Sequence, residues 1–128
     1  MQIGKGPLRQ QVWRHVGDEL PLKGVPLTAQ LVRSVDHKDV AQLVYANEET
    51  AFSVFIAPAS VAFSFGDRQI NEWQVEGIPC RKVECSNTAT FWFGAGGFHC
   101  VLVSQLKDAE KNAAIIRYFV TAHNLLKK

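Results

Sequence analysis

Residues 78–126 read IPCRKVECSNTATFWFGAGGFHCVLVSQLKDAEKNAAIIRYFVTAHNLL, and this stretch decides the fold. Its first part alternates apolar and polar residues, with polar or glycine-rich breaks at SNT and AGG, so it predicts three short strands. Gly94, Gly96 and Gly97 favour a tight hairpin because glycine adopts positive φ at little cost. The stretch therefore predicts a second meander over 78–104, followed by a helix.

The helix is expected over residues 108–126. Asp108 is a suitable N-cap, and Glu110 lies in the first turn, where the helix dipole favours a negative charge. A set of apolar residues recurs at helical spacing and forms one stripe: Ile115, Ile116, Phe119, Val120, Ala122 and Leu126. This long C-terminal helix should pack on one face of the sheet.

Upstream, residues 28–57 predict a first meander. The apolar runs QLVRSVD, VAQLVYA and AFSVFIA are separated by the polar segments HKD and NEET, as in two consecutive hairpins. In the third run Phe52, Val54 and Ile56 share a face that should turn to the core. Together the two meanders predict an antiparallel sheet of about six strands.

The remaining segments are an N-terminal one and a crossing. Residues 1–20 predict a short helix that ends before Pro21, with Leu8, Val12, Val16 and Leu20 at spacings of four. Residues 58–71 fit a short helix, an irregular crossing or an edge strand. A length of 128 residues suits one domain, so the prediction is a single α+β domain over 1–128.

Composition narrows the functional classes. The net charge of +2 is small and the two signs are mixed along the chain, which argues against a nucleic-acid partner. No apolar run reaches the roughly 18 residues of a membrane-spanning helix, and MQIGKGPLRQQ lacks the apolar core of a secretion signal. We expect a soluble chain with no membrane segment.

The three cysteines, Cys80, Cys85 and Cys100, are candidate redox residues. Cys80 and Cys85 are five apart on one expected strand, so they should face opposite ways. Cys100 lies two strands along, about 10 Å away in a sheet, which argues against a direct disulfide. Buried free thiols are the simpler interpretation. His99 beside Cys100 has no paired metal-ligand spacing, and we expect no metal site.

No motif points to catalysis. The GAGG tip joins two strands, whereas phosphate-binding loops lead into a helix. No serine lies in a GxSxG motif, and Asp67, Glu72, Glu76 and Glu84 are scattered. We expect no catalytic residues, no cofactor and no enzymatic activity.

Aromatic residues cover both faces of the last hairpin: Phe91, Trp92, Phe93 and Phe98. One helix covers only one face of a sheet, so these four form a candidate interaction surface. The other face needs the N-terminal segment, the 58–71 region or a second chain as cover. A protein partner or a homodimer is expected on this ground.

The chain also resembles a known family. The segments LPLKGVPLTAQLVRSVDHKDVAQLVYANEETAFSVFIAP (20–58) and GIPCRKVECSNTATFWFGAGGFHCVLVSQLKDAE (77–110) resemble the extracytoplasmic domain of bacterial transmembrane anti-sigma factors and related transmembrane transcriptional regulators. Such regulators carry a cytoplasmic sigma-binding segment and a membrane helix, neither of which is present here. The resemblance implies regulation by contact or by ligand, a periplasmic or extracytoplasmic location, and no reaction. Without it, a cytoplasmic location is expected.

Three hypotheses follow for function. The first is a non-enzymatic regulatory sensor or protein-interaction domain. The second is a small-ligand or lipid carrier with a pocket between sheet and helix. The third is a thiol redox sensor that uses Cys80, Cys85 or Cys100.

Overall fold

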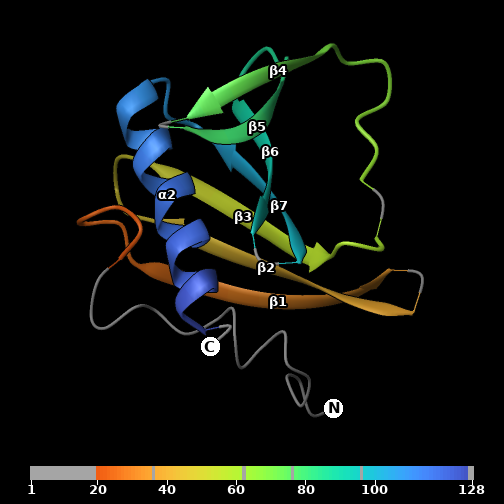
Figure 1. Cartoon of the computed structure of the whole chain (residues 1–128). Helices are drawn as coiled ribbons and strands as arrows, with labels where there is room; N and C mark the ends of the chain where they lie inside the picture. The colour runs from red at the N-terminus through yellow and green to blue at the C-terminus, as the bar shows by residue number, and fades with distance from the viewer. Residues whose placement is uncertain (1–19, 36, 62, 76, 96, 127–128) are drawn as a thin grey trace.

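The computed structural model describes residues 20–35, 37–61, 63–75, 77–95 and 97–126. Within them the chain forms a seven-stranded antiparallel sheet, and the helix α2 lies across one face of it (Figure 1). The elements are β1 (Leu27–Val35), β2 (Lys38–Ala46), β3 (Ala51–Pro58), β4 (Ile70–Val75), β5 (Ile78–Val83), β6 (Ala89–Ala95), β7 (Phe98–Ser104) and α2 (Ala109–Leu126). The predicted α+β class with an antiparallel sheet is confirmed.

The strand order is β1-β2-β3-β7-β6-β5-β4. Strand β7 returns along β3, with Val54 opposite Leu102 and Ile56 opposite Cys100, so the chain's two halves form one continuous sheet. The expected six strands in two three-stranded meanders are wrong. The additional strand is β4, which pairs with β5 and makes the second half four-stranded. The predicted N-terminal helix falls on residues 1–19, outside the described part of the chain.

Three hairpins close on two-residue loops. The closing pairs are Val35 with Lys38, Val75 with Ile78 and Ala95 with Phe98. The second loop residue has positive φ in each: 64° at His37, 84° at Gly77 and 89° at Gly97. Glycine adopts positive φ at little cost, which explains why it occupies two of the three positions.

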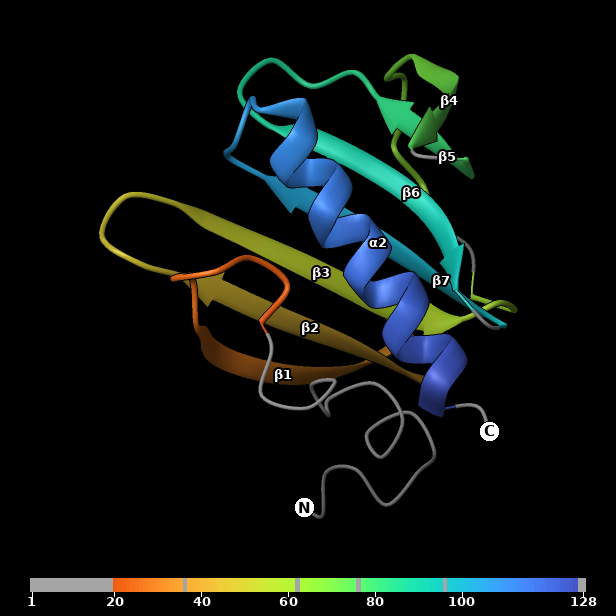
Figure 2. The same ribbon diagram turned by 60° about the vertical axis from the view of Figure 1, so that its left-hand side comes forward.

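The helix-covered face carries the main core (Figure 2). Phe52, Val54 and Ile56 are buried there, as their alternation predicted. From α2, Ile115, Ile116, Phe119 and partly Val120 pack against this layer; the side chains of Ala122 and Leu126 are outside the described part. Tyr45 stacks on Phe52 at 4.9 Å between ring centroids. A contiguous apolar layer between sheet and helix therefore holds the fold together.

Asp108 caps α2 as predicted. Its Oδ1 accepts hydrogen bonds from the backbone N–H groups of Glu110 at 2.9 Å and Lys111 at 3.2 Å. These are two of the donors that a helix start leaves without an intrahelical partner. In the described part of the chain, no helix is long and apolar enough to span a membrane.

Candidate functional site

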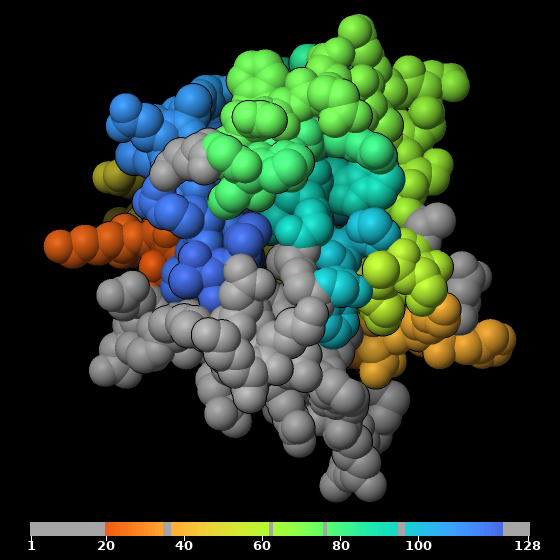
Figure 3. All heavy atoms as spheres, in the orientation of Figure 1, coloured from red at the N-terminus to blue at the C-terminus, as the bar shows by residue number. Residues whose placement is uncertain are grey.

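The face of the sheet opposite α2 is crossed by residues 59–69, which we call the strap. It connects β3 to β4 and arches over the sheet at the right-hand side of Figure 1, and its residues and β4 (green) form much of the upper surface in Figure 3. Of the three alternatives for the 58–71 region, the irregular crossing is observed over 59–61 and 63–69, while residues 70 and 71 begin the edge strand β4. The N-terminal segment, the 58–71 region and a second chain were the candidates for covering this face. The 58–71 region lies on it.

The strap is attached at both ends. At its start, the Ala59 N–H donates to the Gly97 carbonyl at 3.2 Å, and Lys38 Nζ donates to Ser60 Oγ. At its end, the Glu84 N–H donates to the Gln69 carbonyl at 2.9 Å. These contacts tie the strap to two hairpin loops and to the end of β5.

Apolar contacts hold the first half of the strap. Val61 is buried with Val40 and Ala57 of the sheet, and Phe63 packs against this small cluster. The cluster is separate from the main core, because the sheet lies between them. The open face therefore has its own apolar layer, made by the strap.

Between the strap and the sheet lies a groove of about 480 Å³. Apolar side chains make most of its wall: Val40, Phe55, Val61, Phe63, Phe65, Val101 and Val103. The other lining residues are Arg33, Arg68, Cys85, Thr88 and Thr90. Its volume lies in the range of small-molecule sites, roughly 300–1,000 Å³. A mainly apolar wall with a few polar groups is also typical of such sites.

The polar groups of the groove gather where the strap ends. Gln69, the residue after Arg68, accepts a hydrogen bond from the Glu84 N–H at the end of the strap. Cys85 follows Glu84 and therefore lies beside this end. Cys85 Sγ lies 3.5 Å from Thr90 Oγ1, which lies 3.4 Å from Thr88 Oγ1. The groove thus has one end with hydroxyls, a thiol and the Arg68 guanidinium group, and a remainder that is apolar apart from Arg33.

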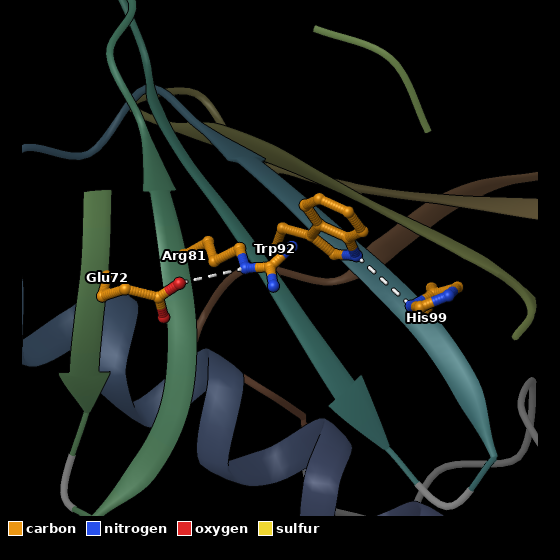
Figure 4. A network of polar contacts seen from close by, with 4 residues as sticks. All are labelled: Glu72, Arg81, Trp92 and His99. Carbon is orange, nitrogen blue, oxygen red and sulfur yellow. Dashed lines mark hydrogen bonds and ion pairs between the residues drawn. The ribbon is translucent and has the colours of Figure 1, made fainter. Parts of the chain in front are cut away.

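A polar network runs beside the groove on the same face (Figure 4). Glu72 pairs with Arg81 at 3.4 Å, and the Arg81 guanidinium lies 4.8 Å above the Trp92 ring. Trp92 Nε1–H donates to His99 Nδ1 at 3.3 Å, and His99 Nε2–H donates to the Ala59 carbonyl at 2.9 Å. The first three contacts join neighbouring strands, and the fourth joins His99 of β7 to the strap.

This hydrogen-bonding pattern defines the state of His99. One ring nitrogen must accept from Trp92 and the other must donate to a carbonyl, which is the neutral imidazole with its proton on Nε2. Phe63 and Phe65 place their rings 6.5 Å and 5.6 Å from Trp92. The network therefore fixes the strap's start and its two aromatic rings against β6 and β7.

The four aromatic residues of the predicted interaction surface are divided between the faces. Phe91 and Phe93 are buried on the helix side, and Phe98 packs against the same core. Only Trp92 of the four lies on the open face. The sequence missed the groove because its walls combine the strap with strands that are far apart in the chain. The available signal was the alternation of Phe63 and Phe65 with small residues.

The three cysteines are free and occupy different surroundings. Cys80 and Cys100 are buried on the helix side with Phe93 between them in the sheet, two strand spacings or about 10 Å apart. Burial raises the pKa of the Cys100 thiol to about 12. Burial and, less strongly, Glu72 raise the pKa of Cys80. Cys85 lies beyond the end of β5 instead of on the strand, half-buried at the groove.

Two other observations bear on binding. No group of three or more residues with metal-ligating side chains occurs in the described ranges. A second cavity of about 180 Å³ lies between the β5–β6 turn and α2, lined in part by Asn112, whose buried Oδ1 has no hydrogen-bond partner. It is below the usual size of ligand pockets and can hold a few waters. At about 480 Å³, against about 280 Å³ for the hollow beside Arg81, Trp92 and His99, the groove under the strap is the candidate site.

Comparison with protein families, curated proteins and solved structures finds no match for this chain. The resemblance to anti-sigma factor domains stays a prediction, and the functional argument depends on the groove itself.

Proposed function

We propose that this chain is a non-enzymatic binding domain that holds a small, largely apolar molecule in the groove between the strap and the open face of the sheet. This is the carrier hypothesis with its pocket relocated. The sequence predicts this pocket between sheet and helix, where the cavity beside the β5–β6 turn measures about 180 Å³ and the side chains of β3 and α2 pack together.

The observation that carries the proposal is the composition of the groove wall. Seven of the twelve lining residues are Val or Phe, and they surround about 480 Å³ that the chain itself leaves unfilled. The groove is open to solvent, and a ligand that covers its Val and Phe side chains removes apolar surface from water, which is favourable. Burial of an apolar ligand would stabilise the complex by about 25 cal/mol for each Å² removed from water.

A regulatory role is compatible with this proposal. The strap is connected to the sheet by a few hydrogen bonds and one small apolar cluster, so a ligand beneath it changes the surroundings of Phe63 and Phe65. A domain that binds in this way can report occupancy to a partner. The proposal itself concerns binding alone.

The test is titration of the purified chain with N-phenyl-1-naphthylamine, a neutral apolar dye that becomes fluorescent when it leaves water. We expect saturable binding of one dye per chain. Native mass spectrometry should show the same stoichiometry. A signal that rises linearly with dye, without saturation, would refute the proposal.

A matched pair of variants assigns the site. Val103 and Val44 lie on the same face and in the same cross-strand row, each opposite Ser53, but only Val103 lines the groove. Val103→Phe should reduce dye binding at least tenfold by occupying the groove, and Val44→Phe should leave it unchanged. Thermal unfolding of both variants confirms that they are folded. Equal binding by all three proteins would place the dye elsewhere.

A further inference from the structure

The geometry points to an amphipathic carboxylate as the ligand of the groove, with its apolar body under the strap and its carboxylate at the Arg68 end. This inference rests on the proposed function and adds the chemical class of the ligand and its orientation.

The first argument is charge. Among the described residues that line the groove, the charged ones are Arg33 and Arg68, and no Asp or Glu is with them. Neither arginine forms an ion pair with a described residue, in contrast to Arg81, which pairs with Glu72. Two guanidinium groups beside an apolar space, neither of them ion-paired with a carboxylate of the described residues, complement a ligand that carries a negative charge.

The second argument is the distribution of polarity along the groove. Arg68 belongs to the end of the strap that meets Cys85, and the hydroxyls of Thr88 and Thr90 lie on the same wall. Arg33 lies instead on the edge strand β1, opposite Val40 and close to the apolar cluster at the strap's start. The Arg68 end thus combines a cationic fork with hydroxyl donors, which a carboxylate accepts well.

Neutral apolar molecules and cations complement the groove less well than an anion does. A neutral apolar molecule leaves the polar end of the groove unused, and a cation is repelled by both arginines. Arginine forms two parallel hydrogen bonds with a carboxylate, and its flat guanidinium group tolerates apolar surroundings better than an ammonium group does. A single anionic head with an alkyl or aromatic body satisfies both parts of the groove.

The experiment measures displacement of N-phenyl-1-naphthylamine by decanoate and by 1-decanol at low ionic strength. We expect decanoate to bind up to about fivefold more tightly than the alcohol, as an exposed charge pair provides. Added salt should narrow this ratio because it screens exposed charges. Each methylene removed from the acid should weaken binding about fourfold.

Three arginine variants test the orientation. Arg68→Gln should weaken decanoate binding about fivefold and leave 1-decanol unchanged. Arg33→Gln should have a smaller effect, and Arg81→Gln, an open-face arginine outside the groove, should have none. Alkylation of Cys85 by iodoacetamide should slow in the presence of decanoate, since this thiol lines the polar end.

The outcomes separate the two proposals. If the dye binds but the acid and the alcohol displace it equally, or if Arg68→Gln leaves the acid's affinity unchanged, the carboxylate inference is wrong and the binding function stands. If the dye does not bind at all, the proposed function itself fails.

Discussion

The thiol of Cys100 should make the stability of the fold depend on alkaline pH. It lies in the middle of the sheet, between Ile56 of β3 and Phe93 of β6, and is 1% exposed. Burial disfavours the thiolate and raises the pKa from 9.0 to about 12. Below pH 9 the thiol is protonated in both the folded and the unfolded chain, and stability is fully present.

Between pH 9 and pH 12 the unfolded chain loses this proton while the folded chain keeps it. The free energy of unfolding therefore falls by about 1.4 kcal/mol for each pH unit in this window. At pH 10.5 the loss from Cys100 alone is about 2 kcal/mol, a large share of the 5–15 kcal/mol typical of a domain. Burial also raises the pKa of Tyr45, so wild-type stability contains a second contribution with the same sign.

Urea unfolding of the wild type and of Cys100→Ala, followed by circular dichroism at pH 7.5, 9 and 10.5, isolates the thiol. At pH 7.5 the variant should be less stable by about 1 kcal/mol because of lost packing. At pH 10.5 the wild type should no longer be more stable than Cys100→Ala. Only the wild type carries the thiol whose ionisation in the unfolded chain lowers the free energy of unfolding. Cys85→Ala, at the half-buried position, controls for thiol ionisation in general. Parallel stability curves for wild type and Cys100→Ala across the three pH values would refute the reasoning.

Three further predictions concern single positions. Asp108→Ala should lower stability by about 1 kcal/mol in urea unfolding, and Asp108→Asn by a few tenths, because asparagine also caps helices. His37→Gly should raise the melting temperature and His37→Val should lower it, since the positive φ there suits glycine and strains a β-branched residue; equal melting temperatures would contradict this. Iodoacetamide at pH 8 should label Cys85 in the folded chain before the buried Cys80 and Cys100, and equal rates for all three would argue for an opened sheet.

The sequence predicted the parts of the fold that have local signals. Alternation placed Phe52, Val54 and Ile56 in the core, and the N-cap placed the start of α2 at Asp108. It missed β4 because this edge strand has a single buried side chain, Val75, and so lacks the alternation of a half-buried strand. The Glu-Gly pair at 76–77, followed by an apolar residue, was the signal of the hairpin to β5.

The pairing of β3 with β7 has no local signal at all. The two strands are about 40 residues apart, and their register depends on which faces must be buried together. That pairing creates the wide open face, so the groove could not be located before it was known. Phe91, Trp92, Phe93 and Phe98 were predicted to lie on both faces of the last hairpin, and alternation sends Trp92 to the open face and Phe91 and Phe93 to the helix side. Their role as an interaction surface stays a prediction.

Side-chain size on the open face explains why the groove exists. One cross-strand row there runs through Val44, Ser53, Val103 and Thr90, all small or β-branched. The strap's large residues do not fill the space above this row, because Phe63 and Phe65 direct their rings toward Trp92. The unfilled volume therefore results from the combination of a small-residue row on the sheet and aromatic rings held to one side by the Trp92–His99 network. Enlarging Val103, a residue of this row that lines the groove, closes the groove without touching the main core, which makes binding and folding separable in this chain.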